Sequence, residues 1–359
     1  MFFLPKFIPF CLFFLLTSGC FSLKKEPVIN FKKRDSSFYR QEFSILCFGD
    51  ILMANEIDKF IKKKGKNFCF RKIKEDLYKY DFVFANLETP ITARGRAVKN
   101  KAYTFRLAPE NSEILKDIKL DVVSVANNHL LDFGVKGMND TLRKLRELRI
   151  VYTGAGINKK ASRIPARIHF GTTQIYFLAY CERPPLSFYA KKKRPGTARI
   201  RLKDIKKDLK LYKKKDNIVL VSLHWGIEKM HYPRRYQKRI ARKIIKAGAD
   251  GIIGHHPHWP QGIEIYKNKP IIYSLGNFIN GYYNDIEKDN IAVAFFYKKN
   301  HLKRLEILSV AGKNHEIHFQ PYIHRGERAR KNLELLQKIS WPFKTDIKIK
   351  GDKGIIYFD

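Results

Sequence analysis

Cysteine is scarce in this sequence, and no two cysteines stand at the spacing of a zinc finger or of a redox-active pair. Cys11 and Cys20 lie near the beginning of the chain, which leaves Cys47, Cys69 and Cys181. This odd set does not indicate a disulfide framework, although a single Cys69–Cys181 bridge stays open. Cys47 stands inside an apolar run and is expected to be a small buried hydrophobic residue.

Long hydrophobic runs are also lacking. The apolar run Phe7–Leu16 is too short to cross a hydrocarbon layer that is about 30 Å thick. One basic residue, Lys6, precedes the run and small residues follow it, which is the layout of a secretory signal. We therefore expect residues 1–20 to direct export of the protein.

The small residues directly before Cys20 resemble a bacterial lipobox, which implies that Cys20 is acylated and anchors an exported lipoprotein in the membrane. Thr17 stands where a lipobox usually has leucine, so an ordinary cleaved signal and an uncleaved anchor are the alternatives. Residues 21–41 are expected to form a polar tether. Basic residues in that tether would add attraction to anionic lipid headgroups.

Acidic residues are few relative to basic ones: 34 Asp and Glu stand against 71 Lys and Arg, a formal net charge of +37. Such an excess suits an anionic partner, such as nucleic acid, anionic lipid or an acidic polymer. A lysine-rich surface without a specific partner is the alternative. Because the export signal places the protein away from DNA, no nucleic-acid partner is expected. The expected partners are an anionic envelope polymer, membrane lipid and a membrane polymer synthase.

Two catalytic motifs are absent. No phosphate-binding P-loop is present, which disfavours an ATP-driven ligase within this chain. No GxSxG elbow is present either, which disfavours a serine hydrolase of the α/β type. No internal repeat is visible. At 359 residues and 44% hydrophobic content, the chain is long and apolar enough for one large domain or two smaller ones.

Apolar, β-branched runs alternate with helical patterns over the first two thirds of the chain. The runs predict buried parallel strands at 43–48, 82–85, 122–125, 218–223 and 252–253. The helical patterns lie at 56–64, 68–79, 135–149 and 233–247. This alternation predicts a layered α/β architecture with central β-sheets flanked by helices.

The last part of the chain has a different pattern. Successive strands are predicted at 271–275, 291–297, 303–310 and 315–319, followed by a helix at 326–339. The proline- and lysine-rich stretch 183–201 is expected to be an exposed loop or an inserted segment. We accordingly divide the folded chain into a main domain, 42–285, and a C-terminal β-rich extension with one helix, 286–359.

Residues with metal-ligand chemistry follow five of the predicted strands. They are Asp50, then Asn86 and Glu88, then Asn127, Asn128 and His129, then His224, and finally His255, His256 and His258. In open α/β sheets, ligand sites lie beyond the carboxyl ends of the strands. Carboxylate and amide oxygens mixed with imidazoles suit Mn, Fe, Zn or Mg. The sequence therefore predicts a site for one or more divalent metal ions.

The amino-acid sequences of these segments resemble those of one known family. The segments are GDILMAN (49–55), ANLETPIT (85–92), ANNHLLDFG (126–134), HWGIE (224–228), GADGIIGHHPHWPQGIEIY (248–266) and IIYSLGNF (271–278). Their order and spacing are similar to those of CapA-type capsule synthesis proteins, implicated in poly-γ-glutamate capsules. That family in turn resembles calcineurin-like metallophosphoesterases, whose fold this resemblance implies for residues 43–280.

The resemblance also implies roles for single residues. It implies metal ligation by Asp50, Glu88, Asn128, His224, His256 and His258, with Glu88 at the bridging position. It implies that His129 is catalytic and protonates a leaving oxygen. Two neighbouring cations in such enzymes hold a phosphoryl oxygen and activate water.

Two positions depart from the enzyme pattern. Leu52 stands where those enzymes have a histidine ligand, and Glu88 stands where they have an aspartate. The site then binds one metal tightly and a second weakly, or recruits another residue, with His255 and Glu228 as the candidates. These departures bear more on catalysis than on the fold.

Four residues near the motifs are candidates for substrate binding: Asn86, Trp225, Glu228 and Asn277. For Trp225 and for Trp259, packing at the rim of the site is the alternative. Two functions follow. The first is a metal-dependent hydrolase or transferase that acts on a capsular or envelope polymer outside the cytoplasm. The second is a non-enzymatic envelope protein that binds such a polymer or scaffolds a membrane synthase.

Overall fold

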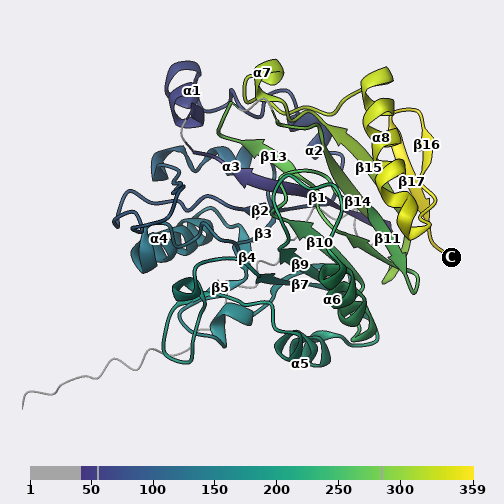
Figure 1. Cartoon of the computed structure of the whole chain (residues 1–359), viewed down its shortest axis with the longest axis horizontal. Coiled ribbons are helices and arrows are strands. Elements are labelled where there is room, and N and C mark those ends of the chain that lie inside the picture. Colours follow the sequence, from purple (N-terminus) through teal and green to yellow (C-terminus); the bar gives the residue numbers. More distant parts are fainter. Residues whose placement is uncertain (1–41, 55, 284–285) are drawn as a thin grey trace, which may run out of the picture.

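The computed structural model describes residues 42–54, 56–283 and 286–359. Two β-sheets pack face to face, and helices cover their outer faces (Figure 1). The layered α/β architecture expected from the sequence is therefore confirmed. The expected signal, tether and Cys20 fall outside the described residues.

The larger sheet has nine described strands in the order β16-β17-β15-β14-β1-β2-β3-β4, with β13 also paired to β1. Their bounds are β1 Glu42–Leu52, β2 Phe82–Leu87, β3 Val122–Ser124, β4 Val151–Thr153, β13 Asn277–Asn280, β14 Asn290–Lys298, β15 His301–Val310, β16 Lys348–Lys350 and β17 Lys353–Tyr357. Strands β1 to β4 are parallel, whereas β14, β15, β17 and β16 are joined as antiparallel neighbours. The C-terminal extension is thus part of the larger sheet.

The second sheet has six described strands in the order β11-β12-β10-β9-β7-β6. Their bounds are β6 Ala166–Phe170, β7 Thr173–Cys181, β9 Asn217–His224, β10 Gly251–His255, β11 Ile263–Tyr266 and β12 Lys269–Ile272. The four central strands are parallel. A small ladder joins β5 (Ala155–Gly156) to β8 (Gly196–Thr197).

Helices flank this sandwich, and the helix Gly326–Ser340 (α8) packs Leu333, Leu336 and Ile339 into the core between the two sheets. Their bounds are α1 Glu56–Lys64, α2 Lys74–Leu77, α3 Ile114–Asp117, α4 Gly134–Glu147, α5 Leu202–Tyr212, α6 Arg235–Lys246, α7 Asn314–Ile317 and α8 Gly326–Ser340. The apolar faces of α1 to α4 pack on the larger sheet, and those of α5 and α6 pack on the smaller one. Short 3-10 turns lie at Pro109–Asn111, Ala161–Arg163, Leu186–Phe188 and Trp341–Phe343.

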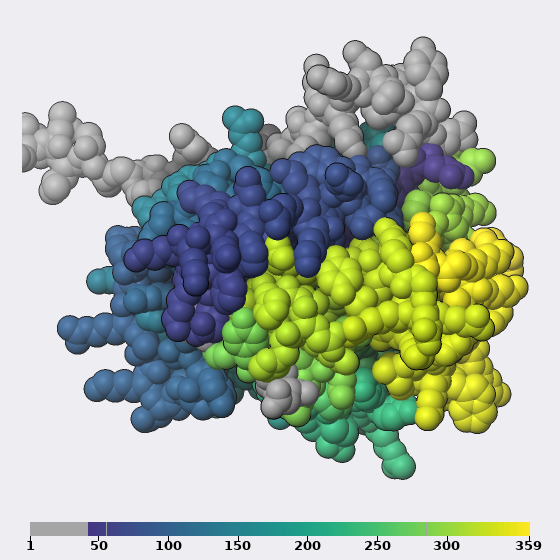
Figure 2. All heavy atoms as spheres, turned by 90° about the horizontal axis from the view of Figure 1, so that it is seen from above, coloured from purple at the N-terminus to yellow at the C-terminus, as the bar shows by residue number. Residues whose placement is uncertain are grey.

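Early and late parts of the chain also meet on one face, where the purple segment adjoins the yellow-green one (Figure 2). The Gln320 side chain donates to the Phe68 carbonyl oxygen at 2.7 Å, and Arg325 pairs with Asp76 at 2.9 Å. These contacts hold the C-terminal residues on the helical layer outside β1. They bind the two ends of the described chain into one folded unit.

Several sequence expectations are wrong in detail. The expected strand 315–319 is replaced by α7, which ends at His318 in a left-handed conformation. Only the second half of the expected helix 68–79 is helical, as α2. Cys69 and Cys181 are buried free thiols, so the bridge between them is not formed.

Aromatic rings fill the interface between the two sheets. Phe84 on β2 stacks on Phe177 on β7 with ring centroids 4.9 Å apart, and both rings are buried. We predict that Phe84→Ala lowers the free energy of unfolding by about 3–5 kcal/mol, because a buried ring is lost and a cavity remains. Denaturant unfolding followed by circular dichroism measures this change.

The matched control is Tyr357→Ala, which removes a ring that is 53% exposed on β17. That change should stay within about 0.5 kcal/mol. Equal effects of the two substitutions would contradict the packing of β2 against β7.

Candidate metal centre

The carboxyl ends of parallel strands from both sheets meet at one edge of the sandwich. Asp50 lies near the end of β1, in register with Asn86 on β2 and Asn277 on β13. His224 ends β9 and pairs in register with His255, the last residue of β10. Residues far apart in the sequence are thereby brought to one place, as the strand-end rule predicts.

Gly49 allows the closest approach in this region. A Cβ atom at Gly49 would lie 1.8 Å from the Gly276 carbonyl oxygen, so only glycine fits. The next backbone amide, that of Asp50, donates to the same Gly276 oxygen at 3.0 Å. The glycine therefore fixes where the Asp50 carboxylate stands.

The Asp50 carboxylate is fully buried and is surrounded by donors. It accepts hydrogen bonds from the Asn86 side chain at 2.8 Å and from the His256 backbone amide at 3.1 Å. Its oxygens also lie 3.3 Å from His255 Nδ1 and 3.6 Å from His258 Nδ1. Burial alone would raise the pKa of Asp50, but these histidines bring that pKa below its ordinary value.

Glu88 presents the opposite situation. It follows β2, is fully buried, and neither of its carboxylate oxygens has a hydrogen-bond partner within the described residues. Burial first, and then the charges of Asp50 and Glu228, raise the pKa of Glu88 well above its ordinary value. A buried carboxylate without a partner is costly, and a cation at this point would remove that cost.

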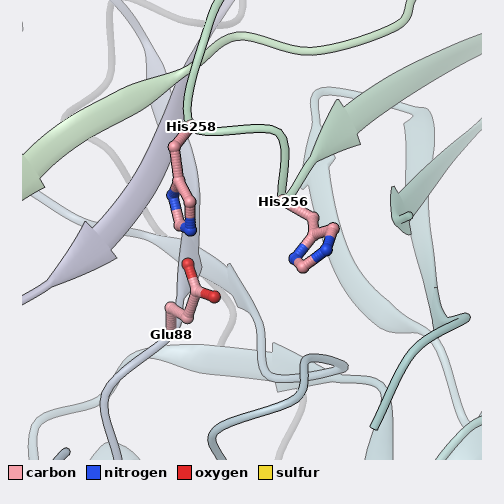
Figure 3. A group of neighbouring side chains, drawn as sticks. All are labelled: Glu88, His256 and His258. Carbon is pink, nitrogen blue, oxygen red and sulfur yellow. The ribbon is translucent and has the colours of Figure 1, made fainter. Parts of the chain in front are cut away.

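Imidazoles and an amide surround the Glu88 carboxylate. His224 Nε2 lies 3.4 Å from Glu88 Oε1 and 2.7 Å from Asn128 Oδ1. His256 and His258 approach from the loop after β10, and His258 points directly at Glu88 (Figure 3). Two groups have ligand atoms within 4.8 Å of one another: Glu88 with His256 and His258, and Asp50 with Glu88 and His224.

The histidines are held in the form that a metal ion needs. Burial, and then the charge of His258, lower the pKa of His256 to about 3. Burial and the charge of His256 lower the pKa of His224 as well. Neutral imidazoles keep a lone pair for a cation. His256 and His258 also have positive φ angles of 96° and 59°, a strained conformation that directs both side chains into the site.

His129 stands beside this cluster with two partners that sequence reasoning missed. Its Nδ1 lies 2.7 Å from Asp132 Oδ2, and its Nε2 lies 4.0 Å from Glu88 Oε1. The ammonium group of Lys101 forms an ion pair with Asp132, lies 2.9 Å from His129 Nδ1, and donates to the Asn128 carbonyl oxygen at 2.7 Å. Asp132 belongs to the ANNHLLDFG segment, whereas nothing in the pattern around Lys101 indicated a site residue.

Two of the four expected substrate contacts are corrected. Trp225 is fully buried, packs on Tyr273 and donates to the Tyr273 carbonyl oxygen, so it is a core residue. Asn86 is also fully buried, and its amide group contacts Asp50, His224 and Asn127. It therefore orients candidate ligands and does not face a substrate.

The other two expected contacts line a cleft of about 250 Å³ that opens over His129 and His258. These are Glu228, which is exposed, and Asn277, which lies 2.8 Å from His258 Nδ1. The other walls are mostly aromatic: Tyr103, Phe105, Trp259, Tyr282 and Tyr283. Leu52 also lines this cleft, where it contributes apolar surface in place of a ligand.

The donor set fits a divalent cation. Glu88 has unpaired oxygens, while Asn128, His224 and His256 place one oxygen and two imidazoles around it. Such a mixture of carboxylate, amide and imidazole ligands suits Mn, Fe, Zn or Mg. The fold and the cluster together define a layered α/β protein with candidate metal-ligand groups at strand ends.

The family follows from comparison with known proteins. The chain belongs to the family described as "Bacterial capsule synthesis protein PGA_cap", whose model matches residues 44–282. It is 32% identical to the "PGA biosynthesis protein CapA" of Bacillus subtilis over 265 residues, which cover 73% of this chain and 70% of that protein. It is 28% identical to the "Capsule biosynthesis protein CapA" of Bacillus anthracis, with 82% of this chain and 72% of that protein covered. The resemblance inferred from the motifs is confirmed.

Similarity to solved structures is more distant. A structure described as a novel phosphatase from Mycoplasma pneumoniae matches with 14% identity and a TM-score of 0.46. The match covers 75% of this chain and 93% of that chain.

The unpaired carboxylate generates a prediction about metal binding. Glu88→Gln keeps the size of the side chain and removes its negative charge. We expect metal affinity to fall at least as much as the roughly 10–100-fold loss typical for an outer-shell partner. Mass spectrometry of bound metal and the metal-induced rise in Tm measure the effect.

Glu306→Gln is the matched control, because Glu306 is paired with Lys353 and Arg304 away from the cluster. It should keep the metal content of the unmodified protein. Equal metal content in all three proteins would show that Glu88 is not a ligand.

Proposed function

We propose that the protein is an exported, membrane-tethered, metal-dependent hydrolase or transferase that acts on an anionic capsule or envelope polymer of the poly-γ-glutamate type. The observation that supports this most directly is the unpaired Glu88 carboxylate facing His224, His256 and His258. Family membership supports the capsule context.

The candidate ligands form two groups, each of which would hold one cation. Glu88 with His256 and His258 would hold one cation. Asp50 and Glu88 with His224 and its neighbour Asn128 would hold a second more weakly, because Leu52 supplies no ligand there. A bound divalent cation would polarise a phosphoryl or carbonyl oxygen and lower the pKa of water. Either Mn, Fe, Zn or Mg fits these ligands.

His129 is placed to move a proton. The Asp132 carboxylate accepts from Nδ1, so Nε2 faces Glu88 and the cleft. Burial, partly opposed by Asp132, lowers the pKa of His129, so the ring is neutral near pH 7 and its Nε2 can accept a proton from an attacking group. Phe105 stacks on the ring at 4.4 Å between centroids and keeps its orientation.

The activity should depend on metal and on the ligand histidines. With full-length protein, we expect hydrolysis of a phosphoester or a γ-glutamyl amide to stop on chelation and to return when Mn²⁺ is added. His256→Ala should lower kcat/KM by more than the roughly 10–100-fold that loss of an outer-shell partner costs. Steady-state kinetics with metal analysis of the same samples provide the measurement.

His301→Ala is the control, since His301 is exposed on β15. It should leave both metal content and turnover unchanged. Full activity after exhaustive chelation would contradict the proposal.

Export and membrane tethering rest on the sequence. Within the residues that the structure describes, no helix has the length and apolar character needed to cross a membrane. We propose that the tether is an acyl chain on Cys20, with residues 21–41 between that anchor and β1. Membrane lipid is then a partner of the mature protein.

Replacing the acylated thiol tests this anchor. We expect Cys20→Ser to move the protein from the membrane fraction to the soluble fraction of the envelope, because a serine cannot take the lipid. Cell fractionation gives the location of the protein, and mass spectrometry of its mature N-terminus shows whether residue 20 is acylated. Persistent membrane association without acylation would instead identify residues 1–20 as an uncleaved anchor.

Leu52 favours a second candidate function. Because this residue removes one ligand from the Asp50 side of the site, a single structural cation in a non-enzymatic polymer-binding or synthase-scaffolding protein is the alternative. Polymer binding that persists in a His224→Ala, His256→Ala double mutant, with no turnover by the unmodified protein, would favour it.

A further inference from the structure

A second, strongly basic pocket lies beside the β5–β8 ladder and the beginning of α5. The elements β5 and α5 are at the lower end of Figure 1. Its volume is about 490 Å³. The basic residues that line it are Lys159, Arg163, Lys191, Lys192, Arg199 and Arg201. One carboxylate, that of Asp204, lies among them.

The nearby carboxylates are already neutralised. Asp204 accepts from Lys159 at 2.7 Å and from Arg163 at 3.2 Å. Asp208 pairs with the guanidinium of Arg163 at 2.5 Å and accepts from the Tyr180 hydroxyl at 2.7 Å. These pairs hold Arg163 and Lys159 in place as the inner wall of the pocket.

The remaining cations have no acidic partner within the described part of the chain. Lys191, Lys192 and Arg201 are exposed at the pocket, and the Arg199 guanidinium lies over the Tyr189 ring at 4.8 Å. The backbone amides at the beginning of α5, after Arg201, add further positive potential. Like charges gathered in this way repel one another, and a bound anion removes that repulsion.

The pocket has a fixed shape. The Lys159 backbone amide donates to the Lys191 carbonyl oxygen at 2.9 Å, which joins its two sides. The Ala198 amide donates to the Gly154 carbonyl oxygen at 2.8 Å. Arg194 donates to the Leu186 and Tyr189 carbonyl oxygens. The lysines therefore stand on a preorganised loop.

The same loop reaches the candidate metal centre. It begins at Glu182, whose backbone amide donates to the His224 carbonyl oxygen at 2.9 Å. Farther along, Lys101 lies 5.7 Å from the centroid of the Phe188 ring, and the Lys101 ammonium also contacts Asp132 beside His129. One segment thus lines the basic pocket and contacts residues that neighbour the candidate metal centre.

The cleft and the pocket differ in charge. Aromatic rings dominate the cleft, whose charged lining includes Glu228, Glu287 and Lys229. It offers little to neutralise a chain of closely spaced negative charges. The basic pocket offers cations from three separate segments around a concavity.

We propose that this basic pocket binds the acidic groups of a polycarboxylate chain, whose reacting part enters the cleft over the metal centre. The proposal rests on the function proposed above. The concave arrangement favours a flexible chain over a membrane surface, because a bilayer cannot follow cations into a pocket. Electrostatic binding of this kind weakens as salt rises.

Charge reversal at two exposed lysines tests the pocket. With full-length protein and a short poly-γ-glutamate as probe, we expect Lys191→Glu, Lys192→Glu to weaken binding at least tenfold. The matched control is Lys62→Glu, Lys63→Glu on α1, which changes the net charge equally at the opposite end of the view in Figure 1. That control should change binding less than twofold.

Fluorescence anisotropy with labelled polymer gives the affinities, and circular dichroism with bound-metal analysis verifies the fold of each variant. A milder pair, Lys191→Gln and Lys192→Gln, should weaken binding to a smaller extent. Equal losses in the pocket and control pairs would overturn the proposal in favour of diffuse charge attraction. Loss of binding to phosphatidylglycerol vesicles, with polymer binding retained, would assign the pocket to lipid and also overturn it.

A further variant distinguishes the role of the metal site from that of the basic pocket. His256→Ala should lose metal while it keeps polymer affinity, since His256 does not line the basic pocket. Polymer binding without turnover in the unmodified protein would reject the enzymatic function and leave the pocket intact. Loss of polymer affinity in His256→Ala would show that the metal centre binds the chain and would overturn the pocket.

Discussion

A buried carboxyl group without a hydrogen-bond partner among the described residues is the constraint around which this structure is arranged. Glu88 has two carboxylate oxygens removed from water, and no described residue donates to either. Asp50, close by, has its charge supported by Asn86, His255 and a backbone amide. Two neighbouring buried carboxylates raise each other's pKa. Because Asp50 has hydrogen-bond donors and Glu88 has none in the described part of the chain, the pKa of Asp50 is lowered and that of Glu88 is raised. A cation at Glu88 would satisfy the electrostatics, and the fold has already brought the candidate ligands together.

That assembly depends on two sheets rather than one. Asp50 and Glu88 belong to the larger sheet, whereas His224 and the loop with His256 belong to the smaller. The aromatic interior between the sheets therefore fixes the distance between carboxylates and imidazoles, and stacked rings such as Phe84 and Phe177 hold it. Gly49 has the same role at the level of the backbone, since its contact with Gly276 sets the position of Asp50. Packing far from the chemistry is thus part of the metal centre.

The strand-end residues could be predicted from the sequence, because a buried parallel strand is a clear apolar run and the polar residue that follows it is easily recognised. Other features left no such signal. The His-Glu-Ile-His-Phe run at 315–319 alternates like a strand, but the backbone turns into α7 with a left-handed His318. Lys101 looks like any surface lysine until tertiary packing brings it to Asp132. Trp225 follows a ligand histidine, yet its side chain points into the core, because alternate residues leave a strand on opposite faces.

The net charge of +37 does not by itself indicate a binding site, whereas the position of the unpaired basic residues in the fold does. Evenly spread lysines would indicate only a soluble surface, and many of them here are paired with carboxylates. At the pocket beside α5, Asp204 and Asp208 already pair with Lys159 and Arg163. The other cations of the pocket therefore face solvent without an acidic partner in the residues that the structure describes. The aromatic cleft differs, because Glu228, Glu287 and aromatic rings line it together with Lys229. In the proposed function, the basic pocket would hold the repetitive acidic chain while the reacting bond would lie in the aromatic cleft, so charge recognition and chemistry would occupy separate places.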